Sequence, residues 1–472
     1  MTVTERVENE PGRTMPVDND RTVFAELPAT TYRYTSTPWM DSANALNGLG
    51  KDATVCANEC GVVMIMSITS FSNAAALKAD PLVEHGISEF TAVDLVTCQS
   101  ASAREGTEVL ASLIDEYGSS EVNIAFIADQ KETWYIEMYS GHQYAAVKLP
   151  KDVVSVFGNE FLLEYASDYE ECIFSPGLEE IAKDNGFAVY GRDNELNLLS
   201  TFSGPEVVTN YSHMRTWIGH KILSPEDIGD YDKEALYPLC FVPQEKVSLQ
   251  DTMELIRNRF EGTEYSPDET GHTDMRVIGT DTALSVHIAQ IYPDLPADIS
   301  CVTWESTGPA VYGVFVPVSN AALSISRPYG RNQPEGQKGI FDTASYPYYR
   351  FKELNTLCVE KNDCVTYGAP VREYWRGAET KMAGAMPEVL KKAEAMEHDD
   401  ACAYITEYCN QVQEQAFFDA GELLNSVRWY RSTNSNTMKN GRNPETHEIL
   451  DELKPVDPLK VELDDSAYGK LP

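Results

Sequence analysis

The segment from Ser102 to Gly118 constrains the fold of this chain most, because it specifies a helix with both ends marked. Ser102 can cap the first turn with its hydroxyl oxygen, and Glu105, three residues on, completes the pattern of a capping box. Gly118 stands where a C-terminal cap with positive φ is wanted. One face of the helix is apolar, since apolar side chains recur at helical spacing at Val109, Leu110, Leu113, Ile114 and Tyr117.

The next stretch predicts a β-hairpin. Apolar side chains alternate with polar or small ones in two runs, at Val122, Ile124 and Phe126 and then at Trp134, Ile136 and Met138. Asp129-Gln130-Lys131 turns the chain between the runs. Trp134 and Glu137 are interpreted as ordinary hairpin residues. Further strand-like stretches alternate with long helical ones along the chain, which favours a layered α/β (α+β) protein.

The charge of the chain argues against one class of partner. Its 37 Lys and Arg stand against 74 Asp and Glu, which gives a formal net charge of −37. Such a surface repels phosphate backbones, so we expect no nucleic-acid partner. The acidic residues are spread along the chain, a pattern typical of a solvated surface.

The sequence shows neither a membrane-spanning segment nor a signal peptide. The longest apolar run, Gly61 to Phe71, is interrupted by polar residues and falls short of the roughly 20 residues that cross a bilayer. The first residues, MTVTERVENEPGR, contain no apolar core of a signal peptide. We therefore expect a cytoplasmic protein without membrane insertion.

The cysteines predict neither a disulfide scaffold nor a metal site. Ten cysteines are scattered over 472 residues, a density ordinary for a reduced protein. Cys56 and Cys60 have the spacing of half a metal site, but no second pair follows at zinc-ribbon spacing. Neither HExxH nor a phosphate-binding loop is present. We expect no cofactor.

The chain divides by composition into four parts. Residues 1–30 are polar and predict an irregular lead-in, and residues 31–376 predict the α/β core. Residues 377–432 are strongly helical, with a break near Asp399-Asp400, and predict a helical segment packed on the core. Residues 433–472 are polar with scattered Pro, Gly and Asn, which predicts a loose tail.

Short motifs occur along the chain in the order in which one known family carries them. They are RYTSTP at 33–38, DPLV at 80–83 with GI at 86–87, SAREG at 102–106, WYIE at 134–137 with GH at 141–142, RTW at 215–217, HIAQI at 287–291, ADIS at 297–300, VFVP at 314–317 and AYITEY at 403–408. By these motifs the chain resembles the dipeptidase A family, cysteine peptidases of the N-terminal-nucleophile hydrolase superfamily.

The resemblance implies a fold, a substrate and a mechanism. The fold is the N-terminal-nucleophile type of four-layer αββα sandwich, here with additional C-terminal helices, and the substrate is a dipeptide. The thiol of a first-residue cysteine attacks the amide carbonyl, and its own α-amino group takes the proton, since that group titrates near neutrality. The resemblance leaves a homo-oligomer open.

One part of the family pattern is absent from this sequence. The family's opening Cys-Thr-Thr and the Arg-Asn-x-Asp stretch behind it have no counterpart, since no cysteine precedes Cys56. The first strands of the implied fold, which carry the nucleophile, are therefore expected to be missing. Where relatives have Ser-Ala-Thr-Glu, this chain has Ile65-Met66-Ser67-Ile68. Two interpretations stay open: an active dipeptidase whose sequence starts upstream, or an inactive relative that binds peptides or assembles.

Three residues are candidates for the site. By resemblance Asn159 donates to the oxyanion, although an Asn after Gly158 is also an ordinary turn residue. Arg215 suits a substrate carboxylate, although an ion pair in an acidic protein is the plainer role. Ser67 lines the pocket by resemblance, but a buried strand serine is the simpler interpretation.

Other nucleophiles and bases are less favoured. His142 and His287 have packing or hydrogen-bonding roles in our interpretation, because the implied mechanism needs no histidine. An internal cysteine nucleophile at Cys98 or Cys301 has no supporting sequence around it.

Overall fold

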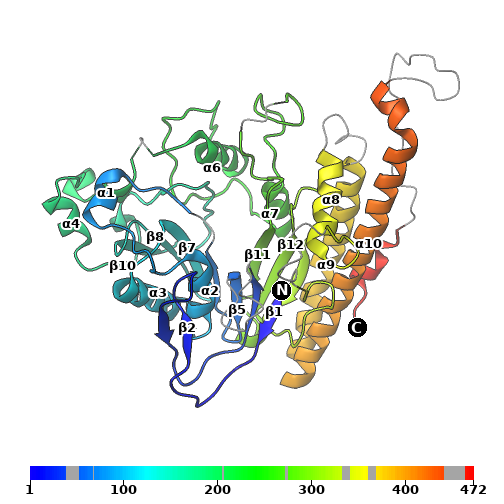
Figure 1. Ribbon diagram of the computed structural model, residues 1–472, viewed down its shortest axis with the longest axis horizontal. Coiled ribbons are helices and arrows are strands. Elements are labelled where there is room, and N and C mark those ends of the chain that lie inside the picture. The colour runs from blue at the N-terminus through cyan, green and yellow to red at the C-terminus, as the bar shows by residue number, and fades with distance from the viewer. Residues whose placement is uncertain are drawn as a thin grey trace.

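The computed structural model describes residues 1–38, 53–66, 69–204, 207–271, 275–331, 341–359, 368–440 and 463–472. The largest element in this part of the chain is an eight-stranded antiparallel sheet in the order β1-β4-β5-β6-β7-β8-β9-β10 (Figure 1). Its strands are β1 Thr2–Thr4, β4 Tyr34–Pro38, β5 Ala53–Asn58, β6 Val63–Met66, β7 Asn123–Ala128, β8 Thr133–Met138, β9 Tyr144–Lys148 and β10 Cys172–Phe174.

The predicted hairpin is confirmed as β7 and β8. The two strands pair in register from Asn123 opposite Met138 to Ala128 opposite Thr133. Asp129 fixes the turn because one of its side-chain oxygens accepts from Lys131 N at 2.7 Å and from Glu132 N at 3.1 Å. The alternation places Trp134, Ile136 and Met138 in the core beneath the helices of this sheet.

The predicted helix is confirmed as α3, Ala103–Tyr117. Ser102 caps it and accepts from Glu105 N at 3.1 Å. The second half of the predicted capping box is wrong in detail, since the Glu105 carboxylate accepts from Ala101 N rather than from the cap residue itself. Gly118 has the predicted positive φ, 72°, but with ψ at 177° it lies outside the left-handed helical region.

Helices α2, Glu89–Thr97, and α3 cover one face of the sheet and bury the apolar side chains of β5 to β8. The opposite face has two neighbours. At β5 and β6 it meets a second antiparallel sheet, of order β11-β12-β13, through Val55, Ala57, Val63 and Cys301. At β7 to β9 it is covered by the segment between Phe157 and Leu239.

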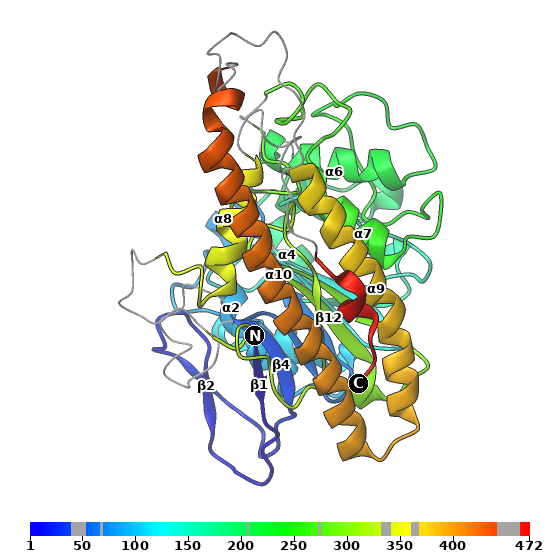
Figure 2. The same cartoon turned by 90° about the vertical axis from the view of Figure 1, so that its right-hand side faces the viewer.

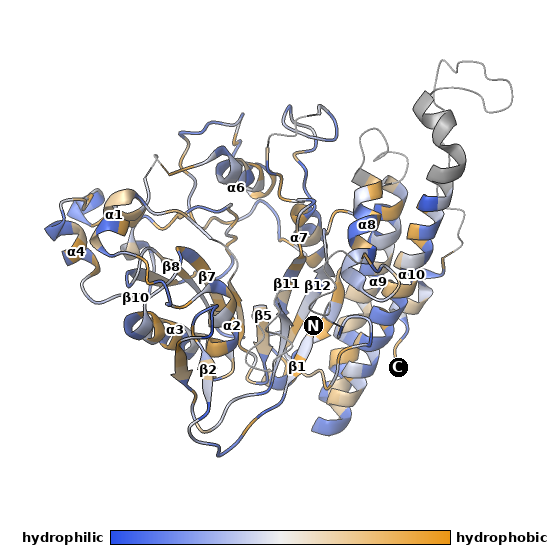
Figure 3. Ribbon diagram, viewed as in Figure 1, coloured by the Kyte–Doolittle hydropathy of each residue, from blue (hydrophilic) through white to orange (hydrophobic). Residues whose placement is uncertain are grey.

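The second sheet consists of β11 Ser285–Ile291, β12 Cys301–Thr307 and β13 Val316–Ser319. Its outer face packs on three helices, α8 Pro347–Val359, α9 Ala369–Glu394 and α10 His398–Asn440 (Figure 2). The break between α9 and α10 falls at residues 395–397, next to the predicted one. Figure 3 shows apolar and polar stretches alternating along these long helices, as one buried face requires.

The remaining elements of the described chain are short. They are β2 Thr14–Pro16 and β3 Phe24–Glu26, helices α1 Ala74–Ala79, α4 Leu178–Asp184, α5 Leu198–Phe202, α6 Asn210–Leu223 and α7 Leu249–Ile256, and the 3-10 turns η2 Ala166–Asp168, η3 Arg192–Asn194, η4 Ala297–Ile299 and η6 Asp465–Gly469. The antiparallel sheets and their helices confirm a mixed α/β protein. Among the described helices, none combines the length and the apolar character that a bilayer span needs.

The DPLV and GH motifs meet in one tight corner. Asp80 accepts from Ser140 Oγ at 2.8 Å and from His142 N at 2.5 Å, and it lies 3.0 Å from His142 Nδ1. A Cβ at Gly141 would lie 2.2 Å from Pro81 O, so this approach requires glycine. These motifs fasten the loop before α2 to the end of the hairpin.

Both ends of the described chain pack against the body of the protein. Within the first 30 residues, where we expected an irregular lead-in, β1 pairs with β4 and β2 pairs with β3. Within the expected loose tail, η6 lies against α9, and Tyr468 is buried with its hydroxyl donating to Asp419 at 2.7 Å. Composition underrates such segments because a few apolar or aromatic contacts suffice to fasten them.

Candidate functional site

Asn159 and Arg215, predicted separately from the sequence, are in direct contact. Arg215 Nη2 donates to Asn159 Oδ1 at 2.7 Å, and Asn159 Nδ2 donates to the backbone oxygen of Thr69 at 2.6 Å. Asn159 lies in a bend at residues 158–160, Arg215 on α6, and Thr69 in the loop after β6. The bond orients the amide, so that its oxygen faces the guanidinium and its nitrogen faces the loop.

The neighbouring Glu160 fixes this bend to α6. Its buried carboxylate lies 3.0 Å from His213 Nδ1 and accepts from Thr216 Oγ1. The same Thr216 hydroxyl accepts from Gly158 N at 3.0 Å. A Cβ at Gly158 would lie 2.3 Å from Ser212 O, so the bend and the helix are in close contact. Both flanks of Asn159 are therefore bound to the helix that carries Arg215.

Arg215 lies near a second guanidinium group, that of Arg276. Partial burial and the nearby charge of Arg276 lower the pKa of its guanidinium to about 10, while Glu160 opposes the shift. The side chain stays protonated at neutral pH and donates through Nε to Tyr211 O at 2.8 Å. Two neighbouring guanidinium groups in a chain of charge −37 favour the binding of a small anion such as a carboxylate.

Two carboxylates, those of Glu89 and Glu121, lie on the other side of Thr69. Glu89 accepts from Thr69 Oγ1 at 3.3 Å and from Asn123 Nδ2 at 2.8 Å, and its backbone N donates to Glu121. Burial raises the pKa of both Glu89 and Glu121 above the usual range for glutamate. The Thr69 loop is thus fastened to Asn159 on one side and to α2 on the other.

Glu137 lies behind the bend, fully buried on β8. Its Oε1 accepts from Tyr135 Oη at 2.5 Å, from Leu162 N at 2.8 Å and from Leu163 N at 3.1 Å. Its Oε2 accepts from Tyr139 Oη at 2.9 Å. Burial raises the pKa of this carboxyl to about 7, although the four donors oppose the shift. Glu137 is a hairpin residue, as expected, but its bonds reach well beyond the hairpin.

The other predicted residues take the following places. Ser67 lies outside the described residues. His142 pairs with Asp80, as described above, and His287 lies 3.4 Å from the buried Glu305 on the neighbouring strand. Cys98 and Cys301 are buried, and burial raises the pKa of each thiol to about 12, which disfavours the thiolate that a nucleophile needs.

Within the described residues one group has the composition of a cation site. Asp18, Asp20 and His85 place ligand atoms within 4.8 Å of one another. Asp18 already accepts from Thr22 N at 2.8 Å and Val23 N at 3.0 Å, and it lies 3.0 Å from His85 Nδ1. These bonds describe a turn anchor, so the group does not by itself indicate a metal.

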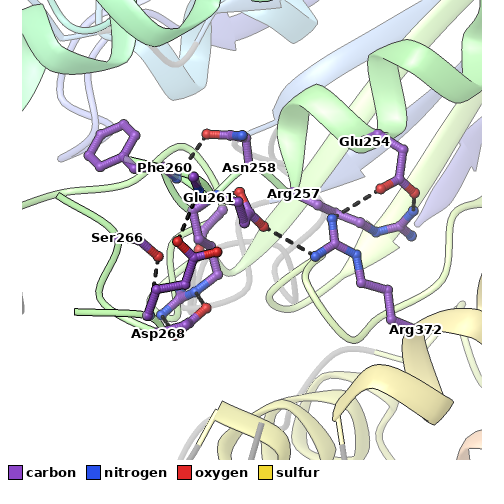
Figure 4. A network of polar contacts seen from close by, with 12 residues as sticks. Glu254, Arg257, Asn258, Phe260, Glu261, Ser266, Asp268 and Arg372 are labelled. Carbon is purple, nitrogen blue, oxygen red and sulfur yellow. Dashed lines mark hydrogen bonds and ion pairs between the residues drawn. The ribbon is translucent and has the colours of Figure 1, made fainter. Parts of the chain in front are cut away.

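A cavity of about 620 Å³ lies elsewhere, between the end of α6, α7 and α9. Glu254 of α7 projects toward it between Arg257 and Arg372 (Figure 4). Arg372 also reaches Glu261 at 3.4 Å, and Arg376 pairs with Glu254. Ion pairs thus join α7 to α9 along this wall, as in a fixed contact between two helices.

The sequence model of Peptidase family C69 matches residues 8–361. This range contains the Asn159 bend, α6, strands β4 to β10 of the large sheet and the whole β11-β12-β13 sheet. The chain therefore belongs to peptidase family C69, which makes it a hydrolase, and the predicted kinship with the dipeptidase A family is confirmed.

Individual relatives agree with this assignment. A probable dipeptidase B of Streptococcus pyogenes serotype M1 is 30% identical over 347 residues, which are 70% of this chain and 67% of that protein. A probable dipeptidase of Latilactobacillus sakei is 29% identical over 316 residues, 66% of this chain and 65% of that protein. A probable dipeptidase B of Lactococcus lactis subsp. lactis is 27% identical over 408 residues, 84% of this chain and 82% of that protein.

Proposed function

We propose that this protein hydrolyses dipeptides and that the bend at Asn159 and helix α6 form one wall of its active site. The observation that carries the site is the bond from Arg215 Nη2 to Asn159 Oδ1, which joins two residues 56 positions apart in the sequence. The substrate class follows from the relatives, which are named as probable dipeptidases.

Asn159 is suited to stabilise the tetrahedral intermediate. A side-chain amide carries two N–H donors, and in this structure one of them donates to Thr69 O. We assign the other to the oxyanion, which a preorganised donor stabilises strongly in a site that excludes water. Arg215 fixes the amide, because an amide with reversed orientation would turn its N–H groups toward the guanidinium.

Arg215, together with Arg276, is suited to the free carboxylate of a dipeptide. The guanidinium has donors beyond the two that bind Asn159 and Tyr211, and a carboxylate accepts such donors in pairs. A dipeptide presents this carboxylate one residue from the scissile amide. We infer that the position of Arg215 beside Asn159 sets this short distance.

The nucleophile and the fold type are proposed by resemblance. The thiol of a first-residue cysteine attacks the amide carbon, and its amine accepts the proton and returns it to the leaving amine as the C–N bond breaks. Water then hydrolyses the resulting thioester, which releases the acid and restores the thiol. We propose that α2 and α3, the two sheets and the helices α8 to α10 correspond to the four layers of the N-terminal-nucleophile sandwich. Support comes from the contact of the two sheets at Val55, Val63 and Cys301.

Asn159→Asp tests the proposed function. Aspartate keeps the shape of the side chain and its contact with Arg215 but removes both N–H donors, so we expect kcat for dipeptides to fall by about 10²- to 10³-fold. The assay uses the protein as its gene produces it, and Asn185→Asp, at the exposed end of α4, is the matched control. Hydrolysis that persists in Asn159→Asp, or that is absent from the natural protein, would contradict the proposal.

A further inference from the structure

The short segment Gly158–Leu163 is bound to two different parts of the protein. Toward α6 it is held by Glu160 and by the backbone of Gly158, as described above. Toward the large sheet it is held by Glu137, which accepts from the backbone N–H groups of Leu162 and Leu163. Asn159 lies between these two attachments, so the second one bears on its position.

The Glu137 carboxyl has an asymmetric set of donors. Three of the four donate to Oε1, and the fourth, the Tyr139 hydroxyl, donates to Oε2. A hydroxyl can also accept. A proton on Oε2 can therefore point to Tyr139 Oη, and all three bonds to Oε1 stay in place. The geometry accommodates a neutral carboxyl without loss of either backbone bond.

The surroundings of Glu137 favour this neutral form. Its four donors are uncharged groups, and its side chain is fully buried. The titratable groups that face it are Tyr135 on its own strand, Tyr139 directly after that strand, and Tyr169 in the loop after η2, whose pKa is raised in part by the charge of Glu137. Glu160, in the segment itself, is engaged with α6.

We propose that Glu137 is a positioning residue, which in its neutral form holds the Gly158–Leu163 segment so that Asn159 faces Arg215, and that ionisation of Glu137 loosens this segment. The effect of Glu137 on activity rests on the proposed function. The attachment itself does not depend on that function.

The direction follows from proton linkage. Opening the segment exposes the carboxyl to water and returns its pKa from about 7 toward the ordinary 4.5, so the open state releases the proton more readily. The closed state is therefore favoured below about pH 4.5, and its advantage is lost as the pH rises to about 7. Between these values the closed-to-open ratio falls by up to about tenfold for each pH unit.

Amide hydrogen exchange measures the attachment without reference to catalysis. In the natural protein we expect the protection of Leu162 and Leu163, normalised to intrinsic exchange, to fall steeply from pH 5 to pH 7. Glu137→Gln carries a permanently neutral group whose oxygen can accept the three Oε1 bonds, so its protection is expected to stay flat. The amides of the β7–β8 hairpin report global opening and serve as the internal control.

Tyr139→Phe is a second variant, which keeps the stacking of the ring on Phe202, 4.4 Å between centroids. It removes a donor that favours the ionised carboxyl, so the loss of protection should extend to higher pH. Tyr144→Phe on β9, whose hydroxyl points to Asp115, is the matched control and should leave the pH dependence unchanged. Equal pH profiles in the natural protein and Glu137→Gln, or no displacement in Tyr139→Phe, would overturn the proposal.

Activity then separates the two proposals. If the protein hydrolyses dipeptides, kcat/KM of the natural protein should fall relative to that of Glu137→Gln between pH 5 and pH 7, because a loosened bend misplaces the Asn159 donor to the oxyanion. A protein without dipeptidase activity but with pH-dependent exchange would contradict the proposed function alone. Dipeptidase activity with flat exchange would contradict the role of Glu137 alone.

Discussion

The protein buries carboxylates in two regions by opposite means. On β8, Glu137 is surrounded by uncharged donors, and burial raises its pKa to about 7. At the joint of α7 and α9, Glu379 takes a bidentate pair from Arg257, with distances of 2.5 and 2.9 Å, and Glu254 is engaged by three arginines. There burial also raises the pKa of Glu254, but Arg376, Arg372 and Arg257 outweigh it and lower the pKa to about 2.

The difference separates a joint that is charged at all ordinary pH values from an attachment that titrates near neutrality. The α7–α9 joint stays ionised from about pH 3 upward, because its carboxylate is paired with guanidinium groups. The attachment of the Asn159 bend changes its charge in the physiological range. The contact between the helices therefore keeps its charge over a range of pH in which the attachment of the bend loses or gains a proton.

Arg257→Met should give the largest effect. Arg257 is 1% exposed, and its removal leaves the buried Glu379 carboxylate without its cation. Loss of one partner of a buried pair typically costs about 3–5 kcal/mol. Urea unfolding at pH 7 measures the loss, and a change below about 1 kcal/mol would show that this joint is not held by its ion pair.

The second-largest effect is expected in the pH dependence of the free energy of unfolding, which Glu137→Gln should change. The raised pKa of Glu137 gives a contribution that is present below pH 4.5 and lost as the pH rises through about 7. The full span of this shift corresponds to about 3 kcal/mol as an order of magnitude. In Glu137→Gln the free energy of unfolding should therefore decline less between pH 5 and pH 7 than in the natural protein. Parallel curves would contradict a titrating Glu137.

A region could be predicted from the sequence where its contacts join residues that are close together in the chain. The α3 helix and the β7–β8 hairpin were predictable because their caps, turn and alternation are local. Asn159 and Arg215 could be chosen from the sequence by resemblance, but their mutual bond spans 56 positions and no periodic pattern encodes it.

The hydrogen-bond networks of Glu137 and Arg257 could not be predicted either, because they also join residues that are far apart in the sequence. The bonds of Glu137 to Leu162 and Leu163 span 25 and 26 positions, and that of Arg257 to Glu379 spans 122. A weak signal existed for Glu137, since alternation in a strand places it on the same face as Tyr135, where a buried carboxylate needs donors. For Arg276, beside Arg215, the sequence offered no signal that we recognise.

Arg376→Met should give the smallest effect and is the matched control for Arg257→Met. Its side chain is 49% exposed, and it binds the half-buried Glu254. Water and salt screen such a pair, so we expect a loss of about 0–1 kcal/mol at neutral pH, smaller still at high salt. The lowered pKa of Glu254 gives stability that is present above pH 4.5 and lost as the pH falls toward about 2. Without Arg376 this loss should begin at higher pH, which acid unfolding between pH 5 and pH 2 measures. An effect as large as that of Arg257→Met would mean that exposure does not separate the two arginines, and that the whole α7–α9 network acts as one unit.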